Sequence, residues 1–369
     1  MKTLLIGVGA AGNKAVYEAV NNNLFKETDT VIINSTSKDF PKDYNGNKII
    51  LSPSDTGCGK ERAVAKEYVK LAIKSGKFNL DNIDNYDTII IATSVEGGTG
   101  SGSTPIIAKY FKQVTKKNVH VIAFTGFEED VRGLANTVEF FQELDTEIVV
   151  QTISNASFLD QANNNKFRAE ELADQEMCKR IRVFTGMDFI DSKQNIDDTD
   201  INKVSNTSGY MTVEYKQLKR PLETQDEFNK IIKNMIYNSH SVKSNNPGAI
   251  RTGVILNISP ESEDAIDYTF NDIFETYGKP YENFLQEQWD GKKEYIAFIV
   301  SGMHMPLDEL KSVYERYKEA SDRVNKETDK FNKELNSLSL NDEDSMFNMI
   351  KNQEKGISTA DFLSTLDNE

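Results

Sequence analysis

Cysteine, histidine and tryptophan are scarce in this chain of 369 residues, which contains two, three and one of them respectively. Cys58 and Cys178 lie far apart, and no spacing of cysteine and histidine resembles a zinc site. We therefore expect neither a disulfide framework nor a metal centre built by these residues. So few cysteines are typical of a reducing compartment, which predicts a cytoplasmic protein.

Basic charge and long apolar runs are also lacking. Lys and Arg number 43 against 58 Asp and Glu, a formal net charge of −15, so direct DNA binding through a uniformly basic surface is not expected. No window approaches the ~18 consecutive apolar residues of a membrane-spanning helix, so no membrane association is expected. The apolar start at Leu4 is broken by Gly7 and Gly9, which favours a buried strand over a secretory signal.

Short apolar runs alternate with helical patterns over the first 150 residues. The runs predict strands at residues 3–6, 31–33, 49–51, 88–92, 119–124 and 147–150. Apolar runs without polar alternation are typical of parallel strands that helices cover on both faces. The predicted fold class is therefore α/β, with a Rossmann-like, doubly wound parallel sheet.

The second half of the chain is more polar. Residues 167–184 predict one long helix, and a polar turn leads to a short helix near residues 201–209. Strand patterns between residues 251 and 300 predict a second, smaller α/β domain, and a long charged helical pattern starts at Pro306. The last residues are rich in acids and poor in apolar anchors, which predicts a mobile acidic tail.

A glycine-rich turn follows the first predicted strand. Gly7-x-Gly9-x-x-Gly12 matches the dinucleotide fingerprint, whose glycines let backbone N–H groups approach phosphate. A nicotinamide-dependent oxidoreductase, the alternative from a different class, also needs an acid after the second strand to bind the ribose hydroxyls. That strand ends at Asn34-Ser35, so this alternative is disfavoured.

A second glycine-rich turn, at residues 97–102, follows the fourth predicted strand. In a doubly wound sheet it lies beside the first, and two turns rich in free N–H groups can wrap a polyphosphate. Gly59-Lys60 lacks the upstream glycine of a Walker motif, so an ordinary P-loop is not predicted.

Five motifs, in order over the first 200 residues, resemble the tubulin/FtsZ superfamily. They are the first nucleotide loop at residues 6–13, the Gly-Gly-Thr-Gly-Ser-Gly signature at 97–102, Glu128-x-x-x-Arg132, Ala173-Asp174 on the long helix, and Asn-x-Asp-x-x-Asp at 195–200. The resemblance implies a GTPase that binds GTP or GDP with Mg²⁺ and polymerises head to tail with itself.

The resemblance also assigns the nucleotide contacts. They are Gly9, Ala10, Ala11, Asn13, Gly97, Gly98, Thr99, Gly100, Ser101, Glu128, Arg132 and Asp174. Thr99 and the backbone beside it are expected to bind the β- and γ-phosphates with Mg²⁺, Glu128 the ribose, and Arg132 a phosphate. Asp174 is expected to accept hydrogen bonds from N1–H and N2–H₂ of guanine, a donor pair that adenine lacks. The alternatives are a solvated helix-face acid for Asp174 and an exposed ion pair for Glu128 and Arg132.

Asn195, Asp197 and Asp200 resemble the family's catalytic synergy loop. In the family this loop lies far from the subunit's own nucleotide and meets that of the next subunit, where its carboxylates orient the attacking water. Hydrolysis is then coupled to a head-to-tail contact that generates a filament. The alternative is an Asx-rich turn with Asp200 as the N-cap of the next helix, and the two roles can coexist.

Several features depart from the family's division proteins. Glu96 stands where the signature has Gly, Ala or Ser, Lys14 stands where a second Asn is common, and residues 359–369 contain no recognisable FtsZ tail peptide. The charged helix from Pro306 resembles the plasmid- and phage-borne TubZ branch, whose C-terminal extension contributes to filament contacts and meets a DNA-bound adaptor. We therefore expect a cytomotive filament GTPase for plasmid or phage DNA segregation in a bacterial host, with a divergent FtsZ-type division protein as the alternative. An acidic tail suits a basic adaptor surface better than DNA itself.

The expected organisation follows from these assignments. It comprises a GTP-binding domain at 1–165, a central helix at 166–187, an activation domain with the catalytic synergy loop at 188–305, a C-terminal helix at 306–337 and an acidic mobile tail at 338–369.

Overall fold

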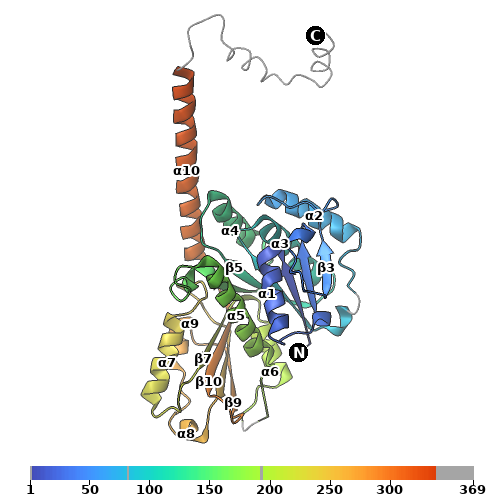
Figure 1. The fold of residues 1–369 in the computed structure, drawn as a ribbon. Coiled ribbons are helices and arrows are strands. Elements are labelled where there is room, and N and C mark those ends of the chain that lie inside the picture. The colour runs from blue at the N-terminus through green and yellow to red at the C-terminus, as the bar shows by residue number, and fades with distance from the viewer. Residues whose placement is uncertain (1, 81–82, 192–193, 338–369) are drawn as a thin grey trace, which may run out of the picture. The chain divides into compact units, whose positions relative to one another are not determined.

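The computed structural model describes residues 2–80, 83–191 and 194–337 (Figure 1). The tail expected at residues 338–369 lies outside them. The chain up to Tyr317 forms one compact unit, and the part of the last helix from Lys318 onward belongs to a second unit.

The compact unit is built on one sheet, which has ten strands in the described part of the chain. They are β1 (Thr3–Val8), β2 (Thr30–Asn34), β3 (Asn47–Ile50), β4 (Thr88–Ser94), β5 (Asn118–Thr125), β6 (Val149–Ser154), β7 (Gly209–Gln217), β8 (Arg251–Asn257), β9 (Glu282–Gln288) and β10 (Tyr295–Met303). Their order is β3-β2-β1-β4-β5-β6-β7-β10-β8-β9. All neighbours pair in parallel except β10, which is antiparallel to β7 and to β8.

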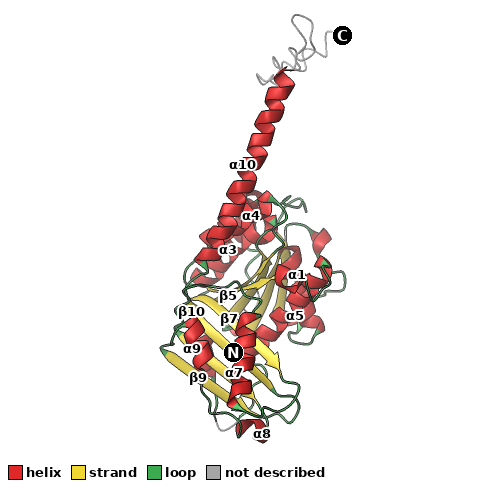
Figure 2. Cartoon of the chain, turned by 90° about the vertical axis from the view of Figure 1, so that its left-hand side faces the viewer, coloured by secondary structure: helices red, strands yellow, loops and turns green. Residues whose placement is uncertain are grey.

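Helices cover both faces of this sheet (Figure 2). They are α1 (Gly9–Asn21), α2 (Arg62–Lys74), α3 (Gly98–Gln113), α4 (Val131–Glu143), α5 (Lys166–Thr185), α6 (Asp198–Ser205), α7 (Gln225–Tyr237), α8 (Pro260–Glu263), α9 (Asn271–Tyr277) and α10 (Leu307–Ser337). Apolar residues of α1, α5 and α6 pack on one face, and those of α2, α3, α4, α7 and α9 pack on the other. Alternate strand residues therefore enter different core layers, as Leu5 and Ile6 of β1 do. The predicted α/β fold with a doubly wound parallel sheet is confirmed.

The second, smaller set of strands shares the sheet of the first. β7 pairs with β6 only at Val149↔Gly209 and Val150↔Tyr210. Further along β6, the buried guanidinium of Arg180 on α5 donates a hydrogen bond to the carbonyl oxygen of Thr152 at 2.9 Å. In the described part of the chain, the strand pairing between β6 and β7 is limited to these two residue pairs, a detail that local sequence patterns do not report.

Several element boundaries differ from the sequence prediction. The strand expected at 147–150 is β6, which runs on to Ser154, and the helix expected near 201–209 is α6, which ends at Ser205 because Gly209 already begins β7. The long central helix α5 begins where the side chain of Asn165 caps the Arg168 N–H and ends at Gly186, whose φ is +68°. Strands β7 and β9 and helices α4, α7, α8 and α9 were not predicted.

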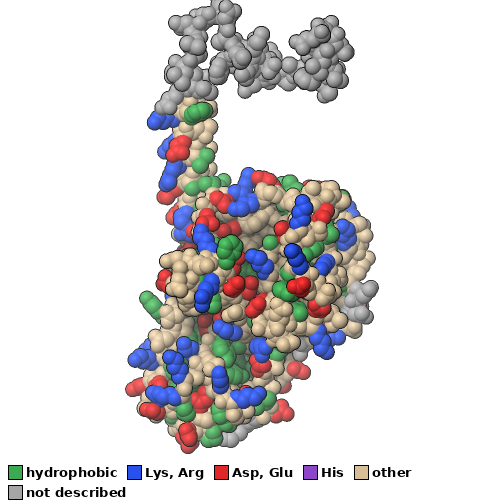
Figure 3. Space-filling model, in the orientation of Figure 1, with side chains coloured by type: hydrophobic (Ala, Val, Ile, Leu, Met, Phe, Trp, Pro, Cys, Tyr) green, Lys and Arg blue, Asp and Glu red, His purple; other side chains and the backbone are tan. Residues whose placement is uncertain are grey.

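The surface agrees with the acidic, mixed composition. Acidic and basic side chains are interspersed over the face seen in Figure 3. Among the described helices, none is both long and apolar enough to cross a membrane.

Candidate functional site

The first glycine loop joins β1 to α1 at the side of the sheet where the parallel strands have their carboxyl ends. We call this side the carboxyl edge, and the side with their amino ends the amino edge. Helix α1 starts at Gly9, and its N-cap residue Val8 makes no side-chain cap hydrogen bond. The first-turn N–H groups, which include those of Ala10 and Ala11, therefore lack the usual side-chain acceptor. Gly9 has a φ of +79°, and a Cβ on it would lie 3.1 Å from the backbone nitrogen of Gly100. Glycine is needed here because the two glycine loops touch.

The second glycine loop starts α3 in the same way. Its N-cap residue is Gly97, which has no side chain, and the helix starts at Gly98. A Cβ on Gly100 would lie 2.6 Å from Oγ1 of Thr93, so this loop is pressed against the end of β4. Because β1 and β4 are neighbours, two uncapped helix N-termini lie side by side and form a strong site for an anion such as a polyphosphate.

A third segment, residues 57–61 before α2, completes this edge. A Cβ on Gly98 would lie 2.7 Å from the backbone of Lys60, and the hydroxyl of Thr99 lies 3.6 Å from Sγ of Cys58. The buried amide of Asn136 donates to the carbonyl oxygens of Lys60, at 3.1 Å, and of Glu96, at 2.9 Å. From its sequence, this segment is predicted only not to be a Walker motif, and its place beside the glycine loops was missed. Its signal was two glycines, at 57 and 59, directly before a helix.

Two of the expected nucleotide contacts are buried side chains that hold the loops in place. Asn13 is fully buried, and its amide exchanges two 3.2 Å hydrogen bonds with the backbone of Ile33 on β2. Ser101 is also fully buried, and its hydroxyl donates to the carbonyl oxygen of Gly97. Only the backbone of these two residues can take part in binding at the surface.

Thr99 is the side chain best placed to join a bound metal ion. Its hydroxyl lies 2.8 Å from that of Ser35, which follows β2. Among the described residues, no group of three or more His, Cys, Asp or Glu side chains could hold a metal ion. A threonine hydroxyl is an oxygen ligand that fits Mg²⁺ beside phosphate oxygens and water, the usual arrangement for nucleotides.

Glu128 and Arg132 do not pair with each other. Glu128 has a φ of +56°, and its carboxylate binds Arg316 of α10, with Nη2 2.9 Å from Oε1. Arg132 binds Glu61 of the third segment at 2.9 Å, so its guanidinium lies at the rim of the glycine loops. The alternative of an exposed ion pair between Glu128 and Arg132 is wrong, because each side chain has a different partner. Their expected contacts with ribose and phosphate stay predictions.

Asp174 on α5 faces the helix that carries the first glycine loop. It is partly buried, whereas its neighbour Ala173 is fully buried. Burial raises the pKa of Asp174 well above its usual range, the acids Glu170 and Glu18 raise it further, and Lys14 opposes them. A freely solvated acid on a helix face would lack this environment.

The Asn195–Asp200 segment is anchored at a different place in the sheet. The N–H of Ile196 donates to Oε1 of Gln286 on β9 at 2.7 Å, so the segment is bound to that strand. The N-cap of α6 is Asp197, which accepts the Asp200 N–H at 2.8 Å, and not Asp200 as the alternative reading had it. The side chain of Asp200 is 27% exposed and lies 3.9 Å from Lys203, while Asn195 is exposed.

The two sets of candidate residues lie at opposite edges of the sheet. The glycine loops follow β1 and β4 at the carboxyl edge. Helix α6 leads to Gly209, which pairs with Val149, the first residue of β6, and Asn206 binds His120 near the start of β5 at 2.8 Å. Helix α6 therefore lies at the amino edge, close to the N-terminus in Figure 1. One chain does not bring its catalytic candidates to its own glycine loops.

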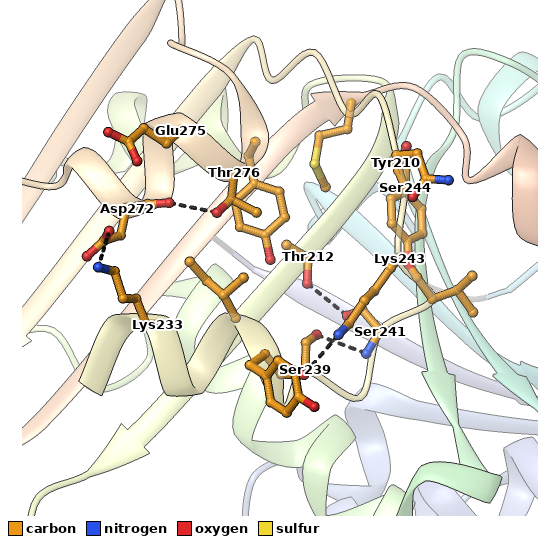
Figure 4. A pocket seen from close by; sticks show the side chains of 16 residues that line it. Tyr210, Thr212, Lys233, Ser239, Ser241, Lys243, Ser244, Asp272, Glu275 and Thr276 are labelled. Atoms are coloured by element: carbon orange, nitrogen blue, oxygen red, sulfur yellow. Dashed lines mark hydrogen bonds and ion pairs between the residues drawn. The ribbon is translucent and has the colours of Figure 1, made fainter. Parts of the chain in front are cut away.

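A separate cavity of about 460 Å³ lies between α7, α9 and β7 (Figure 4). Its polar groups bind one another: the hydroxyls of Thr212 and Ser241 are 2.8 Å apart, and Lys233 pairs with Asp272 at 3.4 Å. None of the predicted site residues, all of which are described, lines this cavity. The candidate site is therefore the pair of sheet edges.

The chain is similar in sequence to known proteins. Residues 2–163 match the model of the Tubulin/FtsZ family, GTPase domain. The mitochondrial division protein fszB of Dictyostelium discoideum is 27% identical over 300 residues, which cover 78% of this chain and 76% of that protein. The cell division protein FtsZ of Rickettsia conorii is 28% identical over 212 residues, 56% of this chain but only 46% of that protein.

Solved structures share the fold. The TubZ protein of Clostridium botulinum phage c-st superposes with a TM-score of 0.69 at 15% identity, over 88% of this chain and 99% of that one. CetZ1 from Haloferax volcanii, solved as a GDP-bound monomer, gives a TM-score of 0.69 at 20% identity, over 86% and 100% of the two chains. At these identities the likeness establishes the architecture.

Proposed function

We propose that this chain, whose residues 2–163 match the model of the Tubulin/FtsZ family, GTPase domain, is a GTPase of that family that binds GTP at the carboxyl edge of its sheet and hydrolyses it at head-to-tail contacts. The observation that carries the proposal is the separation of two incomplete sites. Uncapped helices lie at one edge, and Asn195, Asp197 and Asp200 lie at the other. Stacking identical subunits in one direction joins the two edges and extends without closing.

Binding at the carboxyl edge is a matter of backbone donors and helix dipoles. The first-turn N–H groups of α1 and α3 donate to phosphate oxygens, and the positive ends of both helices favour the negative charge. The Thr99 hydroxyl is the protein group available to Mg²⁺, which, when bound, neutralises charge on the phosphates. Asp174, as a carboxylate, accepts the two donors of guanine and so selects GTP over ATP.

Hydrolysis needs the amino edge of a second subunit. The carboxylates of Asp197 and Asp200 accept hydrogen bonds from a water molecule and hold it for attack on the γ-phosphate, and Asn195 contributes a further amide. The hydrogen bond from the Ile196 N–H to the side-chain Oε1 of Gln286 fixes this segment on β9, so that it approaches the neighbour as a rigid surface. Assembly and turnover are therefore linked.

The test is GTP turnover per subunit measured against protein concentration, with light scattering to follow assembly. Turnover should be low in dilute solution and rise steeply once scattering appears. A specific activity that stays constant far below the assembly threshold would mean that each monomer has a complete site, and the shared-site mechanism would be wrong.

The proposal extends to what the filaments move in the cell. A role in moving plasmid or phage DNA through a DNA-bound adaptor, in the cytoplasm of a bacterial host, is supported by the fold shared with phage TubZ and by the charged helix α10. A structure titled as a TubZ-Bt two-stranded filament superposes with a TM-score of 0.69 at 14% identity. We also propose that the C-terminal region contacts the DNA-bound adaptor. The domain boundaries that the sequence predicts likewise stay a proposal.

A division protein is the second candidate, because the printed names of the relatives fszB and FtsZ describe division. Imaging of the tagged protein in its host separates the two. Filaments that move with a plasmid or phage genome support segregation, whereas a ring at the division plane supports the second candidate.

A further inference from the structure

Glu96 is the residue at which the second glycine loop departs from its family pattern. It directly precedes Gly97, the N-cap residue of α3. A carboxylate so close to two phosphate-binding helix ends would repel a triphosphate if it faced them. What directs its side chain is therefore important for binding.

The carboxylate of Glu96 is held by the loop after β5. Its Oε1 accepts the backbone N–H of Glu128 at 2.9 Å. A Cβ on Gly126 would lie 2.0 Å from Oε2, so the carboxylate fills the space beside that glycine. Glu96 lines a cavity of about 680 Å³ together with Glu128 and Arg316, and none of the glycines at 97–102 lines it. The negative charge is thus turned away from the glycine loop.

The loop that holds Glu96 is in turn held by α10. Nε of Arg316 lies 2.8 Å from Oε2 of Glu128, and Nη2 donates to Oε1 at 2.9 Å. The same guanidinium binds Glu309 at 3.1 Å and Ser312 at 2.6 Å within its own helix. Glu128 has a left-handed φ of +56°, so its backbone N–H reaches Glu96 only while this turn is maintained.

We propose that Arg316 is a positioning residue for GTP binding: through Glu128 it keeps the Glu96 carboxylate directed away from the phosphates. When Arg316 releases Glu128, the turn relaxes and Glu96 is free to face the uncapped start of α3. Attachment of the first turns of α10 is thereby coupled to affinity for the triphosphate. This inference rests on the proposed function, since it concerns the same nucleotide site.

The experiment is a double-mutant cycle on the full chain, read out as equilibrium binding of GTPγS and of GDP. Arg316→Ala should weaken GTPγS binding about fivefold, the scale of one part-exposed ion pair, and GDP binding less, because GDP lacks the γ-phosphate. Glu96→Gln keeps the acceptor for the Glu128 N–H but removes the charge. Arg316→Ala introduced into Glu96→Gln should therefore have no further effect.

The controls separate a specific effect of Arg316 on Glu96 from a general destabilisation of the protein. Arg323→Ala removes an exposed arginine from the same helix and should leave both affinities unchanged. If Arg316→Ala fails to fold, as judged by circular dichroism, Arg316→Gln removes the charge of the same ion pair and keeps a long polar side chain on the helix. Equal weakening by Arg316→Ala with and without Glu96→Gln, or no weakening at all, overturns the coupling. If the unmodified protein binds neither nucleotide, the proposed function is wrong. If it binds both and Arg316→Ala has no effect on either affinity, only the coupling is wrong.

Discussion

The two edges of the parallel sheet start their helices in opposite ways. At the carboxyl edge, α1 and α3 begin with glycine and no side-chain cap, so their first-turn N–H groups face outward for an acceptor. At the amino edge, α6 is preceded by its N-cap Asp197, whose carboxylate accepts the Asp200 N–H from that helix. An uncapped start has donors to offer to an anion, whereas a capped start has satisfied its own donors and offers carboxylates. In the proposed function, each edge completes its chemistry against the other edge of a second molecule.

The largest expected effect comes from disabling the amino edge alone. Asp200→Ala removes a carboxylate that we propose orients the attacking water, and loss of a positioned general base costs about 10²–10⁴ in rate. GTP affinity should not change, because the glycine loops lie at the other edge. Steady-state turnover and GTP binding, measured on the same preparation, test this.

Asp226→Ala is the matched control, since it removes an exposed acid from the first turn of α7. Filaments of the Asp200 variant should persist, because GTP is no longer consumed at the contacts. A loss of GTP affinity as large as the loss of turnover would place Asp200 in the subunit's own nucleotide site and break the contrast between the edges.

The next largest effect concerns the preference of the carboxyl edge for GTP over ATP. Asp174→Ala should remove the preference for GTP over ATP, at a cost of about 2–4 kcal/mol for a desolvated, charge-assisted contact. Glu171→Ala, an exposed acid on the same helix, is the control. Competition of ATP against labelled GTP measures the preference, and equal affinity for the two nucleotides in the unmodified protein would contradict the role of Asp174.

The raised pKa of Asp174 also predicts that the affinity for GTP depends on pH. Its pKa is raised in the free protein, chiefly by burial, so the proton is retained to a higher pH than in a solvated aspartate. Guanine donors require the carboxylate, so GTP binding releases this proton, and affinity increases as pH rises through the raised pKa. Asp174→Asn should abolish that slope. The measurement is the dissociation constant for GTP over a series of pH values, for the unmodified protein and for Asp174→Asn. The same slope in both proteins would mean that another group causes the pH dependence.

A smaller effect separates two adjacent glycines of the second loop. Gly98→Ala puts a Cβ 2.7 Å from the Lys60 backbone, which cannot move aside cheaply, and we expect a loss of about 1–3 kcal/mol in stability together with weaker GTP binding. Gly97→Ala is the control, because no atom lies within 4 Å of its Cβ and its φ of −75° suits alanine. Thermal unfolding and GTP titration of both variants test the pair. Equal losses would show that the third segment does not press on the loop.

The sequence predicted the position of both glycine loops because their signals are local: an apolar strand, glycines and a helical pattern. It could not reveal that Asn13 turns inward to Ile33, or that residues 57–61 lie against Gly98. Glu128 and Arg316, 188 residues apart, pair only because the fold brings them together. Such contacts depend on the approach of distant segments, which residue patterns do not encode one position at a time. The same limit explains why Asp200 was considered as a cap while Asp197, three residues earlier, is the cap.

The smallest effect concerns that cap, and it separates two roles of one side chain. Asp197→Ala removes the acceptor of the Asp200 N–H and should cost about 1 kcal/mol in stability, as N-cap deletions do. Asp197→Asn retains an oxygen that can accept this hydrogen bond but removes the negative charge. Its stability should remain close to that of the unmodified protein, while its GTP turnover falls because a charged acceptor for water is lost. Thermal unfolding and turnover, measured on both variants, test the separation. If Asp197→Asn keeps full turnover, Asp197 serves the amino edge only as a cap, and the water must be oriented by Asn195 and Asp200 alone.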